Sequence, residues 1–425
     1  MLIEIANTLA VQGGEPVRRE PFTTWPVHDE TEQSLIQQAV ASGRWSFDGP
    51  REQEFSLRFA EYLGCKHGFC VANGTVSLEI ALKALGVGHG DEVIVPALTW
   101  LADASAVLDV GAVPIIVDID PENWCIDPTA IEAAITPRTR AVIAVHLYGS
   151  LADLDALLAI SRRRRLPLIE DCAHTHGSRW HDRQAGSIGD VGSFSFQQSK
   201  SLTAGEGGFL STGSYDLASR IFSLKNCGRP WKQKPTGKPL LGSNHRLTEF
   251  QAAILLAQLE RLDQQISTRE QNARYLDEVL GSIPGIVPQR RPDGVTRQSF
   301  YRYAFRVQRE HFGGVHRDVF LEALRAEGIP AEPPYLPIVK QPAFAPEAKW
   351  YPQIAGGVSI GNRPCPAAAS ASDEVVAIPH EVLLGSHEDM EDIVAAIVKI
   401  QESADDLRTL RNRFRTIKTD WFAKK

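Results

Sequence analysis

Lys200 follows an apolar run and precedes a turn that contains Gly205, Gly207 and Gly208. A lysine on a tight, buried turn loses hydration, which favours its neutral amine, and a neutral amine can attack a carbonyl to form a Schiff base. The glycines let the backbone pass close to a ligand where a Cβ atom would clash. Because most lysines beside such turns are exposed surface residues, this segment alone does not establish a catalytic lysine.

Two polar groups at the ends of predicted strands could hold a phosphorylated cofactor. Asn73, Gly74 and Thr75 lie between an apolar run and a helical segment, and the free N–H groups of a helix N-terminus bind phosphate. Asp171 comes shortly after the apolar run 166–169, where a carboxylate could keep a pyridine nitrogen protonated. Each group taken alone is equally well explained as a cap of a helix or turn.

Trp100 and Ser195 complete this set. Trp100 follows a predicted strand and a short turn, so its ring could stack on a cofactor, although a core tryptophan is the commoner case. Ser195 precedes Lys200 by five residues, where its hydroxyl could meet a phosphate. Ligand groups gather at the carboxyl ends of the strands of an open parallel sheet. A phosphate cradle, a ring-nitrogen acid, a stacking aromatic ring and a lysine at these places are the parts that pyridoxal phosphate requires.

The elements that position these residues alternate between helical and strand patterns from about residue 31. Helices are predicted for 32–41, 53–63, 76–85 and 248–280. Strands are predicted for 68–72, 92–95, 113–117, 141–145 and 166–169. This alternation indicates an α/β fold with a mostly parallel sheet that is covered on both faces.

The pattern changes after Pro284, so we expect more than one domain. The predicted parts are an N-terminal arm outside the core (1–30), a large domain (31–284) and a small α+β domain (285–425). The last part includes a predicted strand (299–307), two amphipathic helices (316–327 and 390–401) and a long loop without clear periodicity (341–372).

Composition narrows the class of protein. The 425 residues have 43% hydrophobic and 23% charged content, which is ordinary for a globular protein. A net charge of −7 argues against nucleic acid or an anionic membrane as partner. The six cysteines form no Cys-x-x-Cys pair, which indicates neither a zinc site nor a disulfide framework. With no signal peptide or membrane-length apolar run evident, we expect a cytoplasmic enzyme without a metal site.

The motifs described above resemble those of the DegT/DnrJ/EryC1/StrS family, sugar aminotransferases with the fold of aspartate aminotransferase (fold type I). The resemblance runs from about residue 25 to 400 and is most specific at 73–75, 96–100, 170–177, 195–200, 204–208 and 242–246. It implies a seven-stranded central sheet in the large domain, pyridoxal 5'-phosphate as cofactor, and a homodimer with shared active sites.

The resemblance also implies a role for each matching residue. Lys200 would form the Schiff base with the cofactor and act as the catalytic residue. Asp171 would hold the pyridine nitrogen and Trp100 would stack on the ring. The phosphate would contact Gly74, Thr75 and Ser195, together with Asn244 of the neighbouring subunit.

Within the family, the chain resembles the glutamine:inosose aminotransferases of aminoglycoside biosynthesis at 98–101, 125–128, 145–150, 169–172 and 250–256. This implies an aminotransferase that moves an amino group from L-glutamine or L-glutamate to a keto-cyclitol such as scyllo-inosose or its 2-deoxy form. His174 departs from the usual pattern, because the family commonly has glutamine there, in contact with the phenolic oxygen of the cofactor. Histidine is also found at this position in the 3-amino-5-hydroxybenzoate synthases, which the chain resembles at 196–197, 203–205 and 227–229.

Three alternatives therefore remain open: an aromatising aminoshikimate dehydratase, a nucleotide-ketosugar aminotransferase, and a non-enzymatic protein that binds the cofactor. The candidate substrate contacts are His146, Tyr148, His174 and Arg246. The sequence singles out no arginine for the carboxylate of the amino donor.

Overall fold

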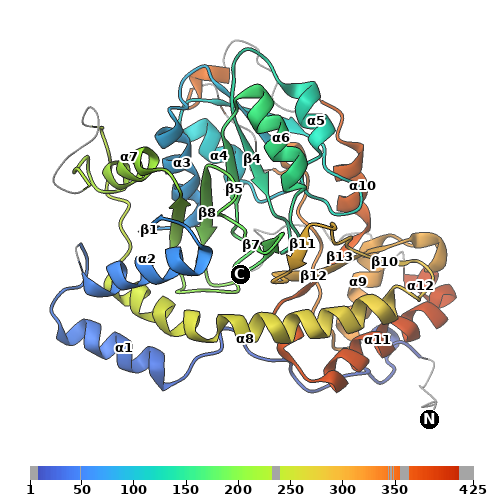
Figure 1. Cartoon of the computed structure of the whole chain (residues 1–425). Helices are drawn as coiled ribbons and strands as arrows, with labels where there is room; N and C mark the ends of the chain where they lie inside the picture. Colours follow the sequence, from blue (N-terminus) through green and yellow to red (C-terminus); the bar gives the residue numbers. More distant parts are fainter. Residues whose placement is uncertain are drawn as a thin grey trace.

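The computed structural model describes residues 8–47, 49–231, 240–342, 344, 347, 349–354 and 363–410. The centre of the molecule is a seven-stranded sheet (Figure 1). Its strands in spatial order are β1 (His67–Val71), β9 (Gly208–Thr212), β8 (Val191–Ser195), β5 (Leu168–Asp171), β4 (Thr139–Val145), β2 (Glu92–Pro96) and β3 (Val113–Val117). β9 is antiparallel to β1 and β8, whereas all pairs from β8 to β3 are parallel. The predicted mostly parallel, seven-stranded sheet is confirmed.

Helices cover both faces of this sheet, so its strands are buried on both sides. These helices are α2 (Pro50–Leu63), α3 (Gly74–Leu85), α4 (Ala102–Asp109), α5 (Pro128–Ala134), α6 (Leu154–Arg164) and α7 (Tyr215–Lys225). The long helix α8 (Glu249–Leu280) begins at a capping box formed by Thr248 and Gln251. It runs beneath the central sheet, from α1 (Glu30–Ala41) and α2 at one end to α11 (His387–Glu402) at the other (Figure 1).

A smaller antiparallel sheet lies beside the first and has the order β10 (Ile286–Pro288), β12 (Arg302–Val307) and β13 (Val375–Pro379). The remaining helices are α9 (Arg317–Ala326), α10 (Pro366–Glu374) and α12 (Ala404–Leu410). A third sheet has the order β11 (Val295–Arg297), β6 (Arg179–Trp180) and β7 (Arg183–Gln184). The described residues also include five short 3₁₀ helices: η1 (Ala10–Gln12), η2 (Arg309–His311), η3 (Ile338–Lys340), η4 (Pro352–Ile354) and η5 (Val382–Leu384).

The buried hydrophobic residues form two clusters, one around the central sheet and one around β10, β12, β13, α9 and α11. The C-terminal part of α8 supplies Ala273, Leu276 and Leu280 to the second cluster. Since α8 takes part in both clusters, a domain boundary at residue 284 stays a prediction. Parts of the predicted loop 341–372 lie outside the described residues, and its C-terminal part contains α10.

The expectation that the N-terminal arm stays outside the core is wrong at Leu9, which is fully buried in the second cluster. The Glu327 carboxylate holds this segment, because it accepts hydrogen bonds from the N–H groups of Ala10 (2.8 Å) and Val17 (3.0 Å). The ammonium group of Lys399 neutralises Glu327 at 2.9 Å. A buried ion pair far along the chain therefore fixes the arm, and this contact is invisible to local sequence patterns.

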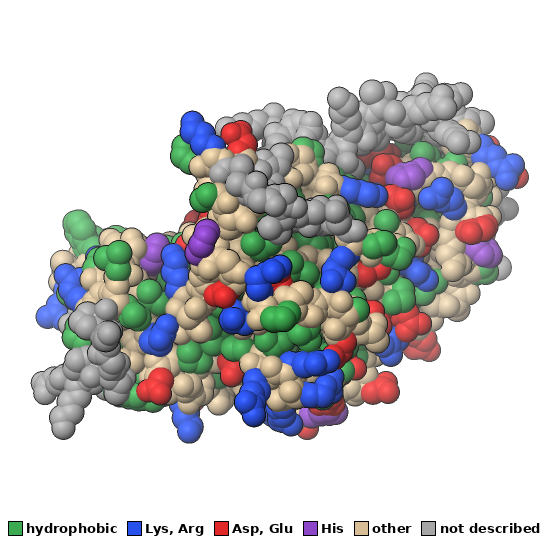
Figure 2. All heavy atoms as spheres, turned by 90° about the horizontal axis from the view of Figure 1, so that it is seen from above, with side chains coloured by type: hydrophobic (Ala, Val, Ile, Leu, Met, Phe, Trp, Pro, Cys, Tyr) green, Lys and Arg blue, Asp and Glu red, His purple; other side chains and the backbone are tan. Residues whose placement is uncertain are grey.

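Acidic and basic side chains lie interspersed over the upper face of the molecule (Figure 2). Among the described residues, no helix is long and apolar enough to cross a bilayer.

Candidate active site

A cavity of about 680 Å³ lies at the carboxyl ends of β1, β2, β5 and β8. Seven of the residues predicted from the sequence line it: Gly74, Thr75, Trp100, Asp171, His174, Ser195 and Lys200. They come from positions as far apart as 74 and 200, and the parallel strands bring them to one edge of the sheet.

The N-terminus of α3 forms one wall of the cavity. Asn73 caps the helix, because its side-chain oxygen accepts a hydrogen bond from the N–H of Val76 at 2.9 Å. The N–H groups of Gly74 and Thr75 precede the first intrahelical bond and carry the positive end of the helix dipole. Gly74 also lies against Ser195, since a Cβ atom added to Gly74 would be 2.7 Å from the Cβ of Ser195. This wall can bind a phosphate through backbone N–H groups and one hydroxyl.

Asp171 is the last residue of β5 and is only 8% exposed. One of its oxygens accepts a hydrogen bond from the N–H of Ala173 at 2.9 Å, which fixes the side chain. A carboxylate held in this way can face a protonated ring nitrogen.

Asp103, on α4, is a second carboxyl group that the sequence did not indicate. It is fully buried, and one of its oxygens accepts a hydrogen bond from the Thr99 hydroxyl at 2.7 Å. Its other oxygen has no hydrogen-bond partner among the described residues. Burial and then the negative charge of Asp171 raise the pKa of Asp103 well above its usual value.

Lys200 lies in the turn after β8, and its ammonium group is 4.6 Å from the centre of the Tyr301 ring. The expectation of a buried turn is wrong for this side chain, which is partly exposed because it opens into the cavity. The Tyr301 hydroxyl and the Ser199 hydroxyl are 2.9 Å apart. Burial acts to raise the pKa of Tyr301, but the nearby cations Lys200 and Arg302 outweigh it and lower that pKa.

His174 is buried in a stack of aromatic rings, with its own ring 4.0 Å from that of Tyr301. Its Nδ1 accepts a hydrogen bond from the N–H of Tyr148 at 3.3 Å, so the neutral ring carries its proton on Nε2. Burial, and then the charge of Lys200, lowers the pKa of His174 well below its usual value. His174 is therefore a neutral hydrogen-bond donor at the cavity wall, as a glutamine side chain would be.

Trp100 offers an accessible ring, because it is 46% exposed although it lines the cavity. Its ring centre is 5.9 Å from that of Tyr335. An uncovered indole face can stack on a planar ligand. Together with the α3 wall, Asp171 and Lys200, it forms a set that fits a phosphorylated pyridine.

The cavity also contains Tyr301, Arg302, Glu332 and Tyr335, none of which the sequence indicated. They come from the start of β12, the residue before it and the segment that follows α9, far along the chain from the glycine-rich turn. The only available signal was polar residues at the start of the predicted strand 299–307.

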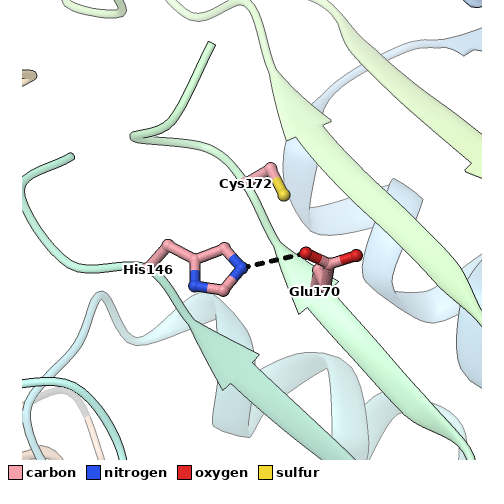
Figure 3. Close-up of side chains that lie close together, drawn as sticks. All are labelled: His146, Glu170 and Cys172. Atoms are coloured by element: carbon pink, nitrogen blue, oxygen red, sulfur yellow. Dashed lines mark hydrogen bonds and ion pairs between the residues drawn. The ribbon is translucent and has the colours of Figure 1, made fainter. Parts of the chain in front are cut away.

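His146 does not line the cavity but lies in the interior beside Glu170 and Cys172 (Figure 3). Its Nε2 is 3.2 Å from a Glu170 oxygen, and its Nδ1 accepts a hydrogen bond from the N–H of Ala152 at 3.2 Å. Glu170 also accepts hydrogen bonds from the N–H groups of Gly186, Ile188 and Gly189.

These three side chains are close enough to hold a metal ion. Burial acts to raise the pKa of Glu170, but the His146 ring and the backbone N–H groups outweigh it and lower that pKa. Burial raises the pKa of the Cys172 thiol well above its usual value, so the thiol keeps its proton. Because His146 and Glu170 already have hydrogen-bond partners within the protein and the Cys172 thiol keeps its proton, we assign the cluster a structural role.

The other predicted contacts lie outside the cavity lining. Tyr148 packs against His174 and supplies the N–H group that sets its tautomer. Asn244 is exposed on the surface, and Arg246 lines a separate cavity of about 530 Å³ together with Phe47 and Leu57. Neither reaches the site within one chain.

Comparison with known proteins agrees with this geometry. The model of the DegT/DnrJ/EryC1/StrS aminotransferase family matches residues 26–398. The chain is 42% identical to the L-glutamine:2-deoxy-scyllo-inosose aminotransferase of Micromonospora echinospora, over 94% of this chain and 99% of that one. It is also 42% identical to the enzyme of the same name from Streptomyces lividus, over 95% of this chain and 100% of that one.

Among solved structures, the chain is similar to 3-amino-5-hydroxybenzoic acid synthase, with a TM-score of 0.81 and 34% identity over 92% of this chain and 100% of that one. The family match, the full-length relatives and the shared fold agree with the arrangement of the cavity. The chain is an aminotransferase that belongs to the DegT/DnrJ/EryC1/StrS family.

Proposed function

We propose that this enzyme uses pyridoxal 5'-phosphate to transfer an amino group from L-glutamine, or L-glutamate, to a keto-cyclitol such as 2-deoxy-scyllo-inosose in aminocyclitol antibiotic biosynthesis. The observation that carries the cofactor assignment is the convergence of the α3 N-terminus, Trp100, Asp171 and Lys200 on one cavity. The substrate assignment is supported by relatives that are 42% identical over nearly their full length.

Different residues of the cavity bind different parts of the cofactor. Gly74, Thr75 and Ser195 hold the phosphate, and Trp100 covers one face of the ring. Asp171 keeps the ring nitrogen protonated, and the N–H of Ala173 holds its carboxylate in place. When bound, the cofactor supplies an electron-withdrawing ring that stabilises the negative charge left when a carbon loses a proton.

Lys200 does the proton transfer. With the cofactor bound, the Lys200 amine would hold it covalently and would act as the base that accepts the proton from the Cα atom of the donor. In the second half of the reaction the same amine would deliver a proton to the cyclitol carbon that receives the nitrogen. Since one cavity serves the donor and the ketone in turn, we expect ping-pong kinetics.

The active form is proposed to be a homodimer. Trp45, Phe47 and Leu57 are 54%, 50% and 72% exposed, which is unusual for large apolar side chains. Phe47 and Leu57 line the same cavity as Arg246. Arg246 is close in sequence to Asn244, which is exposed. A second copy that covers this surface would carry Asn244 to the phosphate of its partner.

The test is the visible absorbance of the purified protein loaded with pyridoxal phosphate. We expect the absorbance of the lysine-bound cofactor to be lost when L-glutamine is added and to return when 2-deoxy-scyllo-inosose follows. If the absorbance does not change when glutamine is added, glutamine is not the amino donor. If the absorbance is lost but does not return with any inosose, an inosose is not the acceptor.

A second candidate, an aromatising aminoshikimate dehydratase, is favoured by His174 and by the similarity to 3-amino-5-hydroxybenzoic acid synthase. Such an enzyme would release water from an aminoshikimate-like ring without an amino donor. The appearance of an ultraviolet-absorbing aminobenzoate in the absence of glutamine would favour it.

A further inference from the structure

Arg302 is the guanidinium group of the active-site cavity. Among the described residues that line the cavity, the lysines and arginines are Lys200 and Arg302. Under the proposed function Lys200 is occupied by the cofactor and by proton transfer. Arg302 therefore remains to bind the negative charge of an amino-acid donor.

The backbone holds Arg302 firmly in place. It is the first residue of β12, is paired with Pro379 of β13, and its N–H donates to the carbonyl of Tyr148 at 3.1 Å. Its guanidinium carbon is 5.0 Å from the centre of the Tyr301 ring. Burial acts to lower the pKa of Arg302, but Tyr301 and Glu332 outweigh it and raise that pKa, so the group stays charged.

Glu332 is the counter-ion of Arg302. A Glu332 oxygen lies 2.8 Å from Nη2 of Arg302, and the two side chains are 34% and 12% exposed. Glu332 is anchored as well, because its backbone exchanges two hydrogen bonds with Ala377 of β13, at 2.8 and 2.9 Å. The pair therefore joins two fixed backbone positions on either side of β13.

This ion pair suits a cavity that must accept first a charged and then an uncharged substrate. An unpaired cation at such a partly buried place is costly, so Glu332 neutralises Arg302 while the neutral ketone is bound. A guanidinium offers five N–H donors, and the contact with Glu332 at 2.8 Å is made through Nη2. A carboxylate can thus approach Arg302 with two parallel hydrogen bonds, in competition with Glu332.

We infer that Arg302 binds the α-carboxylate of the amino-acid donor and that Glu332 competes with that carboxylate for the same guanidinium. This inference rests on the proposed aminotransferase function and names the donor-binding residue of the same site.

The test uses glutaramate, which is glutamine without its α-amino group and so cannot react. Its dissociation constant is measured by calorimetry on the protein loaded with pyridoxal phosphate. Loss of a charge-assisted, bidentate contact in Arg302→Gln should weaken binding by about 10- to 100-fold. Arg302→Lys should recover part of that loss, because it keeps the charge but not the planar fork.

Two further variants separate this inference from its alternatives. Glu332→Gln removes the competing charge, so glutaramate should bind more tightly, by about threefold or more. Arg306→Gln is the matched control, because Arg306 lies on the same strand β12 but pairs with Glu374 outside this cavity, and it should leave binding unchanged. Wild-type affinity in Arg302→Gln, or the same loss in Arg306→Gln, overturns the inference. If Arg302→Gln does not bind the cofactor, the glutaramate dissociation constants of Arg302→Lys and Glu332→Gln still test the inference.

The donor half of the reaction gives an independent readout. In single-turnover measurements of this half-reaction, Arg302→Gln should raise the L-glutamine concentration that gives half of the maximal rate by the same factor as the dissociation constant, with a smaller change in the maximal rate. These measurements use no cyclitol. If the wild-type enzyme takes the amino group from glutamine but aminates no inosose, the proposed ketone substrate is wrong. The role of Arg302 is then still tested by the glutaramate and glutamine measurements.

Discussion

Lys200 is the residue on which the proposed chemistry depends. The cavity wall at the N-terminus of α3 and the ring of Trp100 can bind the cofactor without Lys200, so Lys200→Ala should still bind pyridoxal phosphate. Turnover with glutamine should fall by about 10³-fold or more, because none of the other described residues that line the cavity is a lysine that could move the proton. Cofactor fluorescence and initial rates measure the two properties. Lys200→Arg is the control for charge, and full activity in Lys200→Ala contradicts the proposed function.

Asp103 makes a prediction about stability and pH. In the cofactor-free folded protein, burial and the charge of Asp171 raise its pKa well above the value of 3.8 that applies to the unfolded chain. Its contribution to stability is therefore full below pH 3.8 and is lost as pH rises toward the raised folded pKa. Asp103→Asn cannot ionise, so it should gain stability relative to the wild type as pH rises, by at most about 1.4 kcal/mol per pH unit.

Urea unfolding of both cofactor-free proteins between pH 5 and pH 8 measures this difference. Asp109→Asn, at the exposed end of the same helix, is the control and should show no such trend. Parallel pH profiles for the wild type and Asp103→Asn would mean that Asp103 is ionised in the folded protein.

At the scale of elements, the start of α3 is held in place by Gly208 of β9. A Cβ atom on Gly208 would lie 2.4 Å from the carbonyl oxygen of Asn73. Gly208→Ala must therefore push the phosphate wall aside, at a cost of about 1–3 kcal/mol. We expect a lower melting temperature and about tenfold weaker binding of pyridoxal phosphate. Gly213→Ala is the matched control, because a Cβ atom there meets nothing within 4 Å; equal effects of the two changes would contradict this role.

Strands of the central sheet could be predicted because buried parallel strands appear in the sequence as continuous apolar runs. The predicted runs 92–95 and 113–117 match β2 and β3 within one residue. β9 was missed, since Gly208–Thr212 merges with the glycine-rich turn before it. Which face of the sheet each residue meets was harder to predict.

His146 and Asp171 show why. Both come at the end of a strand. On the first strand Asp171 lines the cavity and its neighbour Glu170 faces the interior, whereas on the second Val145 lines the cavity and its neighbour His146 meets Glu170. Consecutive residues of a strand point to opposite faces, so a shift of one residue in the predicted strand reverses the assignment. Arg302 and Glu332 could not be predicted for a different reason, because only tertiary packing brings them to the cavity.

At the scale of the whole molecule, the exposed position of Asn244 makes a prediction that one chain cannot satisfy. In the proposed dimer, Asn244→Asp places a negative charge beside the phosphate of the partner site and should abolish activity. Lys200→Ala inactivates its own site instead. A mixed dimer then has one site with both defects and one intact site, so random mixing should restore about a quarter of wild-type activity. Unfolding and refolding the two variants together, followed by assay, measures this recovery, and refolding each alone is the control. If Asn244 served its own chain, every site of the mixed dimer would carry one defect and activity would stay absent.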